Sequence, residues 1–463
     1  MGSPNILRRA ARFTGVDRAV AYVILARTWS TLAGVITLYA IVRFLLPDEQ
    51  GFYYTFSSVL GIQIFFELGF SYTLMQCVSH EKAHLVWTEE GTVEGNIRAK
   101  HRLAALLKVA LRWYGVAALL FFAGVLPAGL MFFQKAGATH PSVSWRVPWI
   151  WLAVAESIML FVSPFFVFLE GAGLVARVAL VRLVTSIMTS FALWLALWRG
   201  WALLASPIVS TVGCICGTVW IAARQRRYFA DLLRTNAPKD VLNWRVEVWP
   251  FQWRITVSWL SGYFLSQLAI PVLFRFQGPA TAGQMGLSTS LVLAAQAVGL
   301  AWVSTKAPQF GAYVAKREFD ALDRLFFRTI KQAYPVLLLI CTVLVLGVLT
   351  LNATGSPYRL RVLPPLPFLF MVGKMLVDFG VYFVGVYLRA HKQEPLMVMS
   401  VAGAVITGGT TYFFGRFSGA LGVTAANFAF ALLSIAPALV IFQQKRRLWH
   451  AAPLVAYAEA DIA

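Results

Sequence analysis

Apolar runs long enough to cross a lipid bilayer dominate this sequence. A helix needs roughly 20 residues to cross about 30 Å of hydrocarbon, and about twelve such runs follow one another along the chain. Hydrophobic residues make up 59% of the chain and charged residues only 13%, whereas charged residues are about a quarter of a soluble domain. We therefore predict an all-α integral membrane protein with about 12 transmembrane helices.

The predicted spans divide evenly between the two halves of the chain. Their approximate bounds are 20–46, 52–78, 105–133, 148–169, 178–198, 201–223, 250–274, 283–305, 331–351, 364–388, 396–415 and 418–442.

A motif that occurs twice indicates that the two halves arose by duplication. The pattern Arg-Phe-x-x-Pro-x-x-x-Gly begins at Arg43 and again at Arg275, and Thr-x-Ser-x-Leu-x-Gly begins at Thr28 and again at Thr256. A third set of matching Ser and Gln residues follows in the same order at nearly the same offset. Six spans in each half make the repeats parallel. We expect two six-helix lobes related by a pseudo-two-fold axis along the membrane normal, a plan found in secondary transporters.

The basic residues predict the orientation of the chain. The net charge is +20, and most Lys and Arg residues fall in the N-terminal segment, in every second connection and in the C-terminal segment. Because Lys and Arg in short loops favour the cytoplasmic side, both termini are predicted to be cytoplasmic. Topology and attraction to anionic lipids account for most of this charge, and no nucleic-acid partner is expected.

Five segments follow from these patterns. Residues 1–19 form an amphipathic basic segment expected on the inner membrane face, residues 20–223 the first lobe and residues 224–249 a cytoplasmic linker. Residues 250–442 form the second lobe and residues 443–463 a cytoplasmic tail.

Arginines inside spans are candidates for binding an anionic group. Arg27 and Arg254 occupy nearly equivalent positions in the two halves, so the axis would place them on opposite sides of one central space. Arg112 lies in the third span, nearer its end. Ionisable residues at the bilayer centre cost at least about 2.5–3.5 kcal/mol and normally face an interior. The alternative is that these long side chains reach the headgroups instead.

Carboxylates inside spans are candidates for ion coupling. Lys374 and Asp378 are four residues apart on one helical face and can pair; the pair is either structural, or Lys374 binds an anion while Asp378 changes partner during transport. Glu67 and Glu156 have no basic partner nearby in sequence, which makes either a candidate proton carrier. A simple interhelical hydrogen bond is the alternative.

Sequence signatures of catalysis, metal binding and ATP hydrolysis are missing. No Gly-x-Gly-x-x-Gly, P-loop, His-Glu-x-x-His or Gly-x-Ser-x-Gly motif occurs. We therefore expect no enzyme activity, no catalytic residues, no cofactor and no metal. The four cysteines lie in apolar spans and are expected to be buried small hydrophobes: Cys77, Cys214, Cys216 and Cys341.

The run from Arg43 to Tyr53, with Arg27-x-Trp29 before it and Glu67-Leu68-Gly69 after it, resembles the first two helices of bacterial polysaccharide flippases. These belong to the multidrug/oligosaccharidyl-lipid/polysaccharide exporter (MOP) superfamily and are similar to multidrug and toxic compound extrusion (MATE) proteins. The resemblance implies transport of an undecaprenyl-pyrophosphate-linked oligosaccharide across the bacterial inner membrane. Membrane lipids, a polysaccharide polymerase and glycosyltransferases are the further partners implied.

In that interpretation, one set of residues binds the lipid headgroup and another couples transport to an ion. The anionic headgroup would be bound by Arg27, Arg254, Arg112 and Lys374, because guanidinium groups match phosphate oxygens. Ion coupling would fall to Glu67, Glu156 and Asp378.

Three alternatives remain open. An ion-coupled multidrug exporter of the same fold would favour a hydrophobic, acidic cavity for organic cations. A membrane-bound glycan polymerase, ligase or acyltransferase would be expected to carry a large external catalytic loop, and the longest external gap predicted here spans residues 134–147. A lipid-binding scaffold without transport activity is the third.

Overall fold

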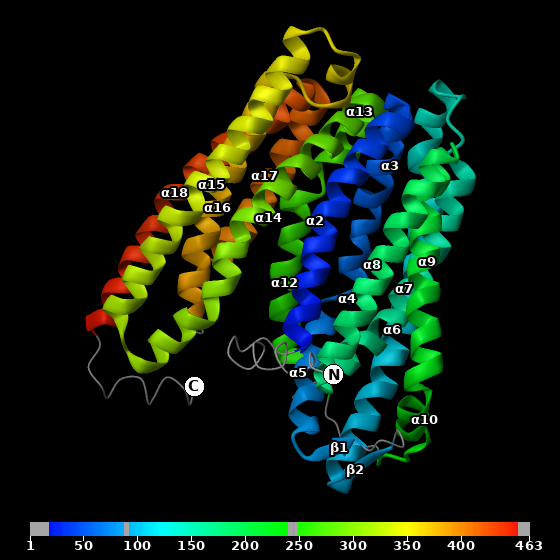
Figure 1. Cartoon of the computed structure of the whole chain (residues 1–463), viewed down its shortest axis with the longest axis vertical. Helices are drawn as coiled ribbons and strands as arrows, with labels where there is room; N and C mark the ends of the chain where they lie inside the picture. Colours follow the sequence, from blue (N-terminus) through cyan, green and yellow to red (C-terminus); the bar gives the residue numbers. More distant parts are fainter. Residues whose placement is uncertain are drawn as a thin grey trace, which may run out of the picture. The chain divides into compact units, whose positions relative to one another are not determined.

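The computed structural model describes residues 18–87, 92–238, 244, 249–391, 393 and 395–451. Most of these residues lie in long helices (Figure 1). Within this part of the chain, ten helices are long and apolar enough to cross a membrane, and one bent pair of helices would make an eleventh. The protein is therefore a multi-pass membrane protein built from helices, as the sequence predicts.

The helices fall into two compact units, residues 1–263 and 264–463. In chain order the elements of the first are α2 (Arg18–Phe44), α3 (Pro47–Leu60), η1 (Gly61–Gln63), α4 (Ile64–Glu67), α5 (Phe70–Lys82), β1 (Leu85–Trp87), β2 (Val93–Gly95), α6 (Ile97–Thr139), α7 (Arg146–Gly171), α8 (Val175–Trp198), η2 (Ala202–Leu204), α9 (Ala205–Trp220), the π-helical turn η3 (Ile221–Gln225), α10 (Arg226–Arg234) and most of α12 (Trp249–Ser266). Those of the second are α13 (Ala269–Gln277), α14 (Pro279–Lys316), α15 (Phe319–Ala353), η5 (Pro357–Arg361), α16 (Pro365–Ala390), α17 (Met397–Phe417) and α18 (Gly419–Ala451).

The packing within each unit repeats, which supports the duplication. In the first unit α2 packs on α8, α5 on α6 and α7, α7 on α6 and α9, and α8 on α9. In the second unit the helices at the corresponding chain positions make the same six pairs: α13 with α17, α14 with α15 and α16, α16 with α15 and α18, and α17 with α18. Two sequences that share only short motifs thus pack equivalent helices together.

The repeated motif forms the turn between the first two segments of each half. Pro47 is the first residue of α3, and Pro279 is the first residue of α14. Proline suits this position because the amide N–H groups in the first turn of a helix make no hydrogen bond within the helix, so the missing N–H of proline costs nothing there. The residue before Pro279 is Gly278, whose φ of 91° is left-handed, whereas its counterpart Leu46 is extended. Arg43 and Arg275 consequently lie in the last turns of α2 and α13.

Two of the predicted spans are not single continuous helices in the structure. The span 52–78 is a helix pair, Pro47–Glu67 and Phe70–Lys82, bent by 48°. The span 250–274 is interrupted between α12 and α13 at Gln267 and Leu268. Pro271 gives the reason for the second break, because its ring would collide with the carbonyl four residues earlier in a regular helix.

Predicted loops on one side of the first unit are also more ordered than expected. α6 begins at Ile97, capped by the side chain of Asn96, and therefore extends beyond the predicted third span. Part of the predicted linker forms α10, which packs against α6 and β2. Lys100 pairs with Asp231 of α10 at 2.9 Å. The segments 1–17, 239–243, 245–248 and 452–463 lie outside the described residues, so the amphipathic N-terminal helix and most of the predicted tail stay predictions.

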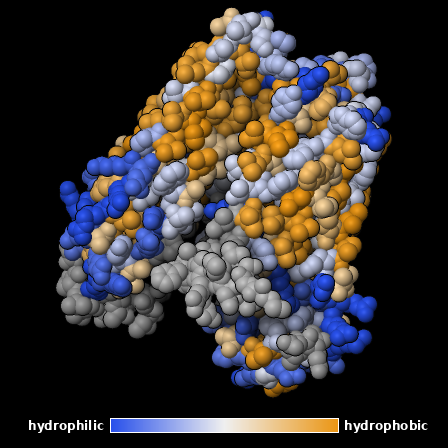
Figure 2. Space-filling model, viewed as in Figure 1, coloured by the Kyte–Doolittle hydropathy of each residue, from blue (hydrophilic) through white to orange (hydrophobic). Residues whose placement is uncertain are grey.

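Apolar side chains cover the flanks of both units as well as their interiors. Phe52, Phe56, Phe133 and Trp149 are fully buried in the first unit, while large residues such as Met131 and Leu433 are exposed. Figure 2 shows apolar surface over most of each unit and hydrophilic residues gathered at one end. Lipid-facing helices give this distribution. Cys341 is buried as predicted, but Cys77, Cys214 and Cys216 are only half-buried.

Candidate functional site

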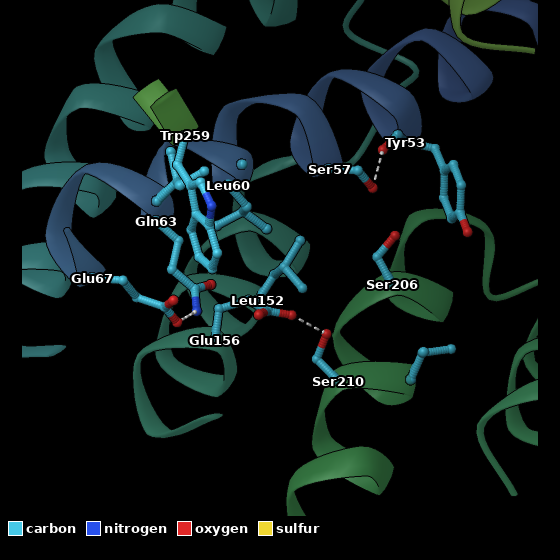
Figure 3. Close-up of a pocket in the computed structure, with 13 residues that line it drawn as sticks. Tyr53, Ser57, Leu60, Gln63, Glu67, Leu152, Glu156, Ser206, Ser210 and Trp259 are labelled. Carbon is cyan, nitrogen blue, oxygen red and sulfur yellow. Dashed lines mark hydrogen bonds between the residues drawn. The ribbon is translucent and has the colours of Figure 1, made fainter. Parts of the chain in front are cut away.

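A cavity of about 490 Å³ lies in the first unit. Segments that are far apart in the sequence line it, namely α3 with its continuation to α4, then α7, α9 and α12 (Figure 3). The residues that line it are Tyr53, Ser57, Leu60, Gly61, Gln63, Ile64, Glu67, Leu152, Glu156, Ser206, Val209, Ser210 and Trp259. Two of the three carboxylates predicted for ion coupling, Glu67 and Glu156, are therefore brought together in one cavity.

The break in the second span positions Glu67. Leu68 and Gly69 both adopt left-handed backbone angles, with φ of 48° and 65°, and the helix ends directly after Glu67. The carbonyl of Leu68 accepts a hydrogen bond from Thr256 Oγ1 of α12 at 2.7 Å. Freed carbonyls inside a membrane need such partners, so the hydroxyl of Thr256 stabilises the broken backbone beside the carboxylate.

Glu67 is held by polar neighbours on its own chain segment and beyond it. Gln63 Nε2 donates to Glu67 Oε1 at 3.4 Å, and Ser71 Oγ donates to Glu67 Oε2 at 3.0 Å. Ser71 in turn lies 2.7 Å from the hydroxyl of Tyr114. All these partners are uncharged and can reorient their hydrogens. The network can therefore accommodate Glu67 either as a carboxylate or with a proton.

Glu156 accepts a short hydrogen bond from another helix. Ser210 Oγ of α9 donates to Glu156 Oε1 at 2.5 Å. Trp151 Nε1, one turn earlier on α7, donates to Thr211 Oγ1 of α9 at 3.0 Å. These two bonds join α7 to α9, which also pack on each other, and they direct the carboxylate toward the cavity (Figure 3).

The composition of the wall limits what the cavity can bind. Among the described lining residues there are two carboxylates and no Lys, Arg or His. Tyr53 and Trp259 add aromatic rings, and the other residues are apolar or carry uncharged polar groups. An acidic cavity with aromatic walls suits a proton, a metal cation or an organic cation, because both carboxylates and ring faces attract positive charge.

Two of the predicted headgroup arginines, Arg27 and Arg112, are not among the residues that line this cavity. Arg27 is exposed on α2 and Arg112 is exposed on α6, and neither contributes to the wall. The side chain of Arg254 lies outside the described residues, so the predicted pairing of Arg27 with Arg254 across a central space stays a prediction.

Lys374 and Asp378 form the ion pair that their spacing predicts. Lys374 Nζ lies 2.5 Å from Asp378 Oδ2 on α16, and both residues are half-buried. The pair belongs to the second unit and is not among the residues that line the cavity of the first. Whether Asp378 changes partner during transport stays a prediction.

Several residues of the cavity were not predicted from the sequence as site residues. Gln63 stands four residues before Glu67, a spacing that places the two side chains on one helical face. Ser71 contacts Glu67 from the far side of the break at Leu68 and Gly69 and does not line the cavity. Ser210, Tyr53 and Trp259 carry no comparable signal, because they reach the cavity from helices whose packing only the fold determines.

Comparisons of the whole fold with solved structures decide the architecture. A multidrug resistance MATE family transporter of the MOP superfamily, in an inward-facing conformation, superposes with a TM-score of 0.64 at 12% identity, covering 92% of this chain and 99% of the other. The MATE multidrug transporter DinF-BH, solved as a complex with a bound compound, gives 0.60 at 12% identity, covering 97% of both chains. The chain has a MATE fold.

A further solved structure has a similar fold, and comparisons of the sequence found no relative. A MOP superfamily transporter from Pyrococcus furiosus, described as having a binding pocket of reverse polarity, gives a TM-score of 0.55 at 12% identity, covering 94% of this chain and 96% of the other. No protein-family model matches the sequence, and no curated protein matches it. The MATE fold agrees with the predicted fold class of twelve helices in two lobes. At this identity, the likeness establishes architecture and does not establish a substrate.

Proposed function

We propose that this protein exports organic cations, as a multidrug exporter does, and draws the energy from a cation gradient coupled through Glu67 and Glu156. The observation that carries the proposal is the acidic cavity, in which both carboxylates share a wall without a lysine or arginine among the described lining residues. An acidic cavity favours an ion-coupled multidrug exporter over a lipid-linked oligosaccharide flippase, which the sequence alone had favoured.

The size and chemistry of the cavity support a small ligand. Its volume of about 490 Å³ falls within the roughly 300–1,000 Å³ typical of small-molecule sites. A diphosphate-bearing glycolipid needs cationic partners, and the carboxylates here would repel it. An organic cation would instead find two counter-ions and the indole of Trp259, which is 36% exposed.

Coupling follows if the two carboxylates bind either the entering cation or the substrate. Carboxylates in a wall of uncharged groups attract a proton or a metal ion when no substrate is present, since a buried charge without a partner is costly. The break at Leu68 allows the angle between the two helices beside Glu67 to change. Exchange of one cation for the other would then accompany the switch between inward- and outward-facing states that alternating access requires.

The experiment compares efflux by charge-neutralised variants. Wild type, Glu67→Gln and Glu156→Gln are expressed in bacteria that lack their own exporters, and efflux of a cationic dye such as ethidium is followed by fluorescence. We expect each substitution to slow efflux at least about tenfold, because an amide cannot carry a proton or balance a cation. Reconstituted vesicles with an imposed pH or sodium gradient identify the coupling ion.

The control is Glu170→Gln, which changes the same side chain on the same helix. Glu170 does not line the cavity and pairs with Arg182 at 3.1 Å, so efflux should stay close to wild type when expression is matched. Undiminished efflux in the double variant Glu67→Gln/Glu156→Gln would refute the coupling role. Loss of surface polysaccharide in a deletion strain, with no change in dye efflux, would favour the flippase instead.

A further inference from the structure

A second pocket lies in the other unit, far along the sequence from the acidic cavity. It has a volume of about 560 Å³ and lies where α15 begins and α18 approaches its end. Figure 2 shows that end of the unit covered by hydrophilic residues. The residues that line the pocket are Asp320, Asp323, Arg324, Phe327, Arg328, Lys331, Gln332 and Arg446.

Three cations of α15 give this pocket its positive charge. Arg324, Arg328 and Lys331 follow one another at helical spacings of four and three residues, which places them on one face, and all three are exposed. Among the described residues, none of the three has a carboxylate partner. With Arg446 the wall carries four positive charges against the two of Asp320 and Asp323, a net charge of +2.

The fourth cation is held rigidly. Asp323 is buried and accepts a hydrogen bond from Arg446 Nε at 2.9 Å and another from the hydroxyl of Tyr387 at 2.8 Å. The guanidinium carbon of Arg446 lies 5.9 Å from the ring centroid of Phe327. Asp323 is thus used to fix Arg446 in place, and it offers little compensation to the three cations of α15.

The position along α15 places the pocket at the depth of lipid headgroups. The helix has 35 residues, about 52 Å at 1.5 Å per residue, which exceeds the roughly 30 Å hydrocarbon core. Its charged residues are confined to the first four turns, up to Lys331, and the apolar part follows. The first turns of α15 therefore extend beyond the hydrocarbon.

The exposed face of α15 changes from basic to apolar along its length. In the apolar part of the helix beyond Lys331, exposed residues include Leu338 (47% exposed), Leu339 (66% exposed) and Val343 (61% exposed). A phospholipid has matching parts in the same order, a phosphate followed by acyl chains. A free phosphate ion shares the headgroup chemistry but has no acyl chain to contact the apolar residues.

We propose that this pocket binds the headgroup of an anionic phospholipid, whose acyl chains lie along the exposed face of α15. Basic pockets between membrane helices bind such headgroups, and two arginines can each donate a pair of hydrogen bonds to phosphate oxygens. The site is separate from the acidic cavity and does not depend on the proposed transport function.

The experiment counts lipids retained by the purified full-length protein. Native mass spectrometry is performed after addition of phosphatidylglycerol or phosphatidylcholine to wild type and to the triple variant Arg324→Gln/Arg328→Gln/Lys331→Gln. We expect wild type to retain phosphatidylglycerol in preference to phosphatidylcholine. At equal lipid concentration, the triple variant should retain at least about fivefold less phosphatidylglycerol than wild type.

The matched control removes three other exposed cations outside the pocket, Arg224→Gln/Arg226→Gln/Arg227→Gln. It should change phosphatidylglycerol binding less than about twofold, because the pocket is intact. Equal losses in the two triple variants would overturn the proposal, since net charge would then explain binding. A wild type that retains both lipids equally would overturn it as well.

A second variant separates a lipid from free phosphate and guards against misfolding. Leu338→Ser/Leu339→Ser leaves every cation in place and should weaken phosphatidylglycerol binding at least about twofold, while competition by inorganic phosphate at millimolar concentration should be weak. If phosphate displaced the lipid fully and the leucine substitutions had no effect, the pocket would be a phosphate site and the lipid assignment would be wrong.

Discussion

At the scale of single residues, His391 shows how burial makes a side chain sensitive to pH. It lies just after α16, is 8% exposed, and stacks on Trp449 with ring centroids 3.8 Å apart. Its Nδ1 lies 3.2 Å from the carbonyl of Tyr387, where an N–H can donate, and its buried Nε2 has no partner among the described residues. A neutral ring fits this setting better than a charged one.

The first prediction concerns acid stability. Burial lowers the pKa of His391 below 6.5, reinforced by nearby His450 and opposed by the Tyr387 carbonyl and Asp323. The unfolded chain therefore binds the proton more readily, and the free energy of unfolding falls as pH decreases below about 6.5. We expect the apparent Tm in detergent to decrease by a few degrees between pH 7.5 and 5.5.

Variants identify the source of that decrease. His391→Phe keeps a flat ring beside Trp449 but cannot be protonated, so its Tm should depend less on pH than that of wild type. His80→Gln, which removes an exposed histidine in the first unit, should leave the dependence unchanged. An identical pH slope in wild type and His391→Phe would rule out this histidine as the cause.

At the scale of elements, the break in the second span is the feature that the apolar pattern does not reveal. Leu68 is not a glycine, yet it has a φ of 48°, a conformation disfavoured for residues with a Cβ. A strained backbone persists when its surroundings hold it and is often found at functional sites. Here the strain lies directly beside Glu67, and Gly69 follows it with a φ of 65°.

The second prediction tests the requirement for glycine at the break. Gly69→Ala should destabilise the protein by about 1–2 kcal/mol, because a Cβ is unfavourable in the left-handed region, and should lower the Tm in detergent. Gly34→Ala is the control: Gly34 lies inside α2 and an added Cβ would meet no atom within 4 Å. That substitution should be neutral or stabilising by up to about 1 kcal/mol. Equal effects would contradict the interpretation.

The parts of the site that could be predicted are those with a signal within a single segment of the sequence. Glu67 and Glu156 stood out because a carboxylate in an apolar run is expensive, and Lys374 with Asp378 because a spacing of four places them on one helical face. Ser210 and Trp259 gave no such signal, since serines and aromatic residues are common in membrane helices. The meeting of α3, α7, α9 and α12 around one cavity depends on contacts between distant segments.

At the scale of the whole molecule, the parallel repeat predicts a definite topology. Six spans in each half return the chain to the side where it began, and the distribution of Lys and Arg assigns that side to the cytoplasm. The recurring helix pairs in the two units support the repeat, while the orientation in the membrane is a prediction from charge.

The third prediction uses cysteine labelling to test the orientation. In a variant with all four native cysteines replaced by alanine, Ser142→Cys lies in the turn between α6 and α7, and Asn236→Cys follows α10; both positions are exposed. A membrane-impermeant maleimide added to intact cells should label position 142 and should label position 236 only after permeabilisation. The reverse pattern would show that the charge rule assigns the wrong side.

The sequence by itself determined the membrane class, the approximate spans and the internal repeat, because hydrophobic length and spacing are local properties of the chain. Only the tertiary structure decided that the two carboxylates share a cavity without a basic residue among its described walls, and that Arg27 and Arg112 lie elsewhere. The physical reason is that the charge of a cavity is a sum over side chains from several helices. That sum depends on which helix faces meet, and no single helix pattern fixes the pairing.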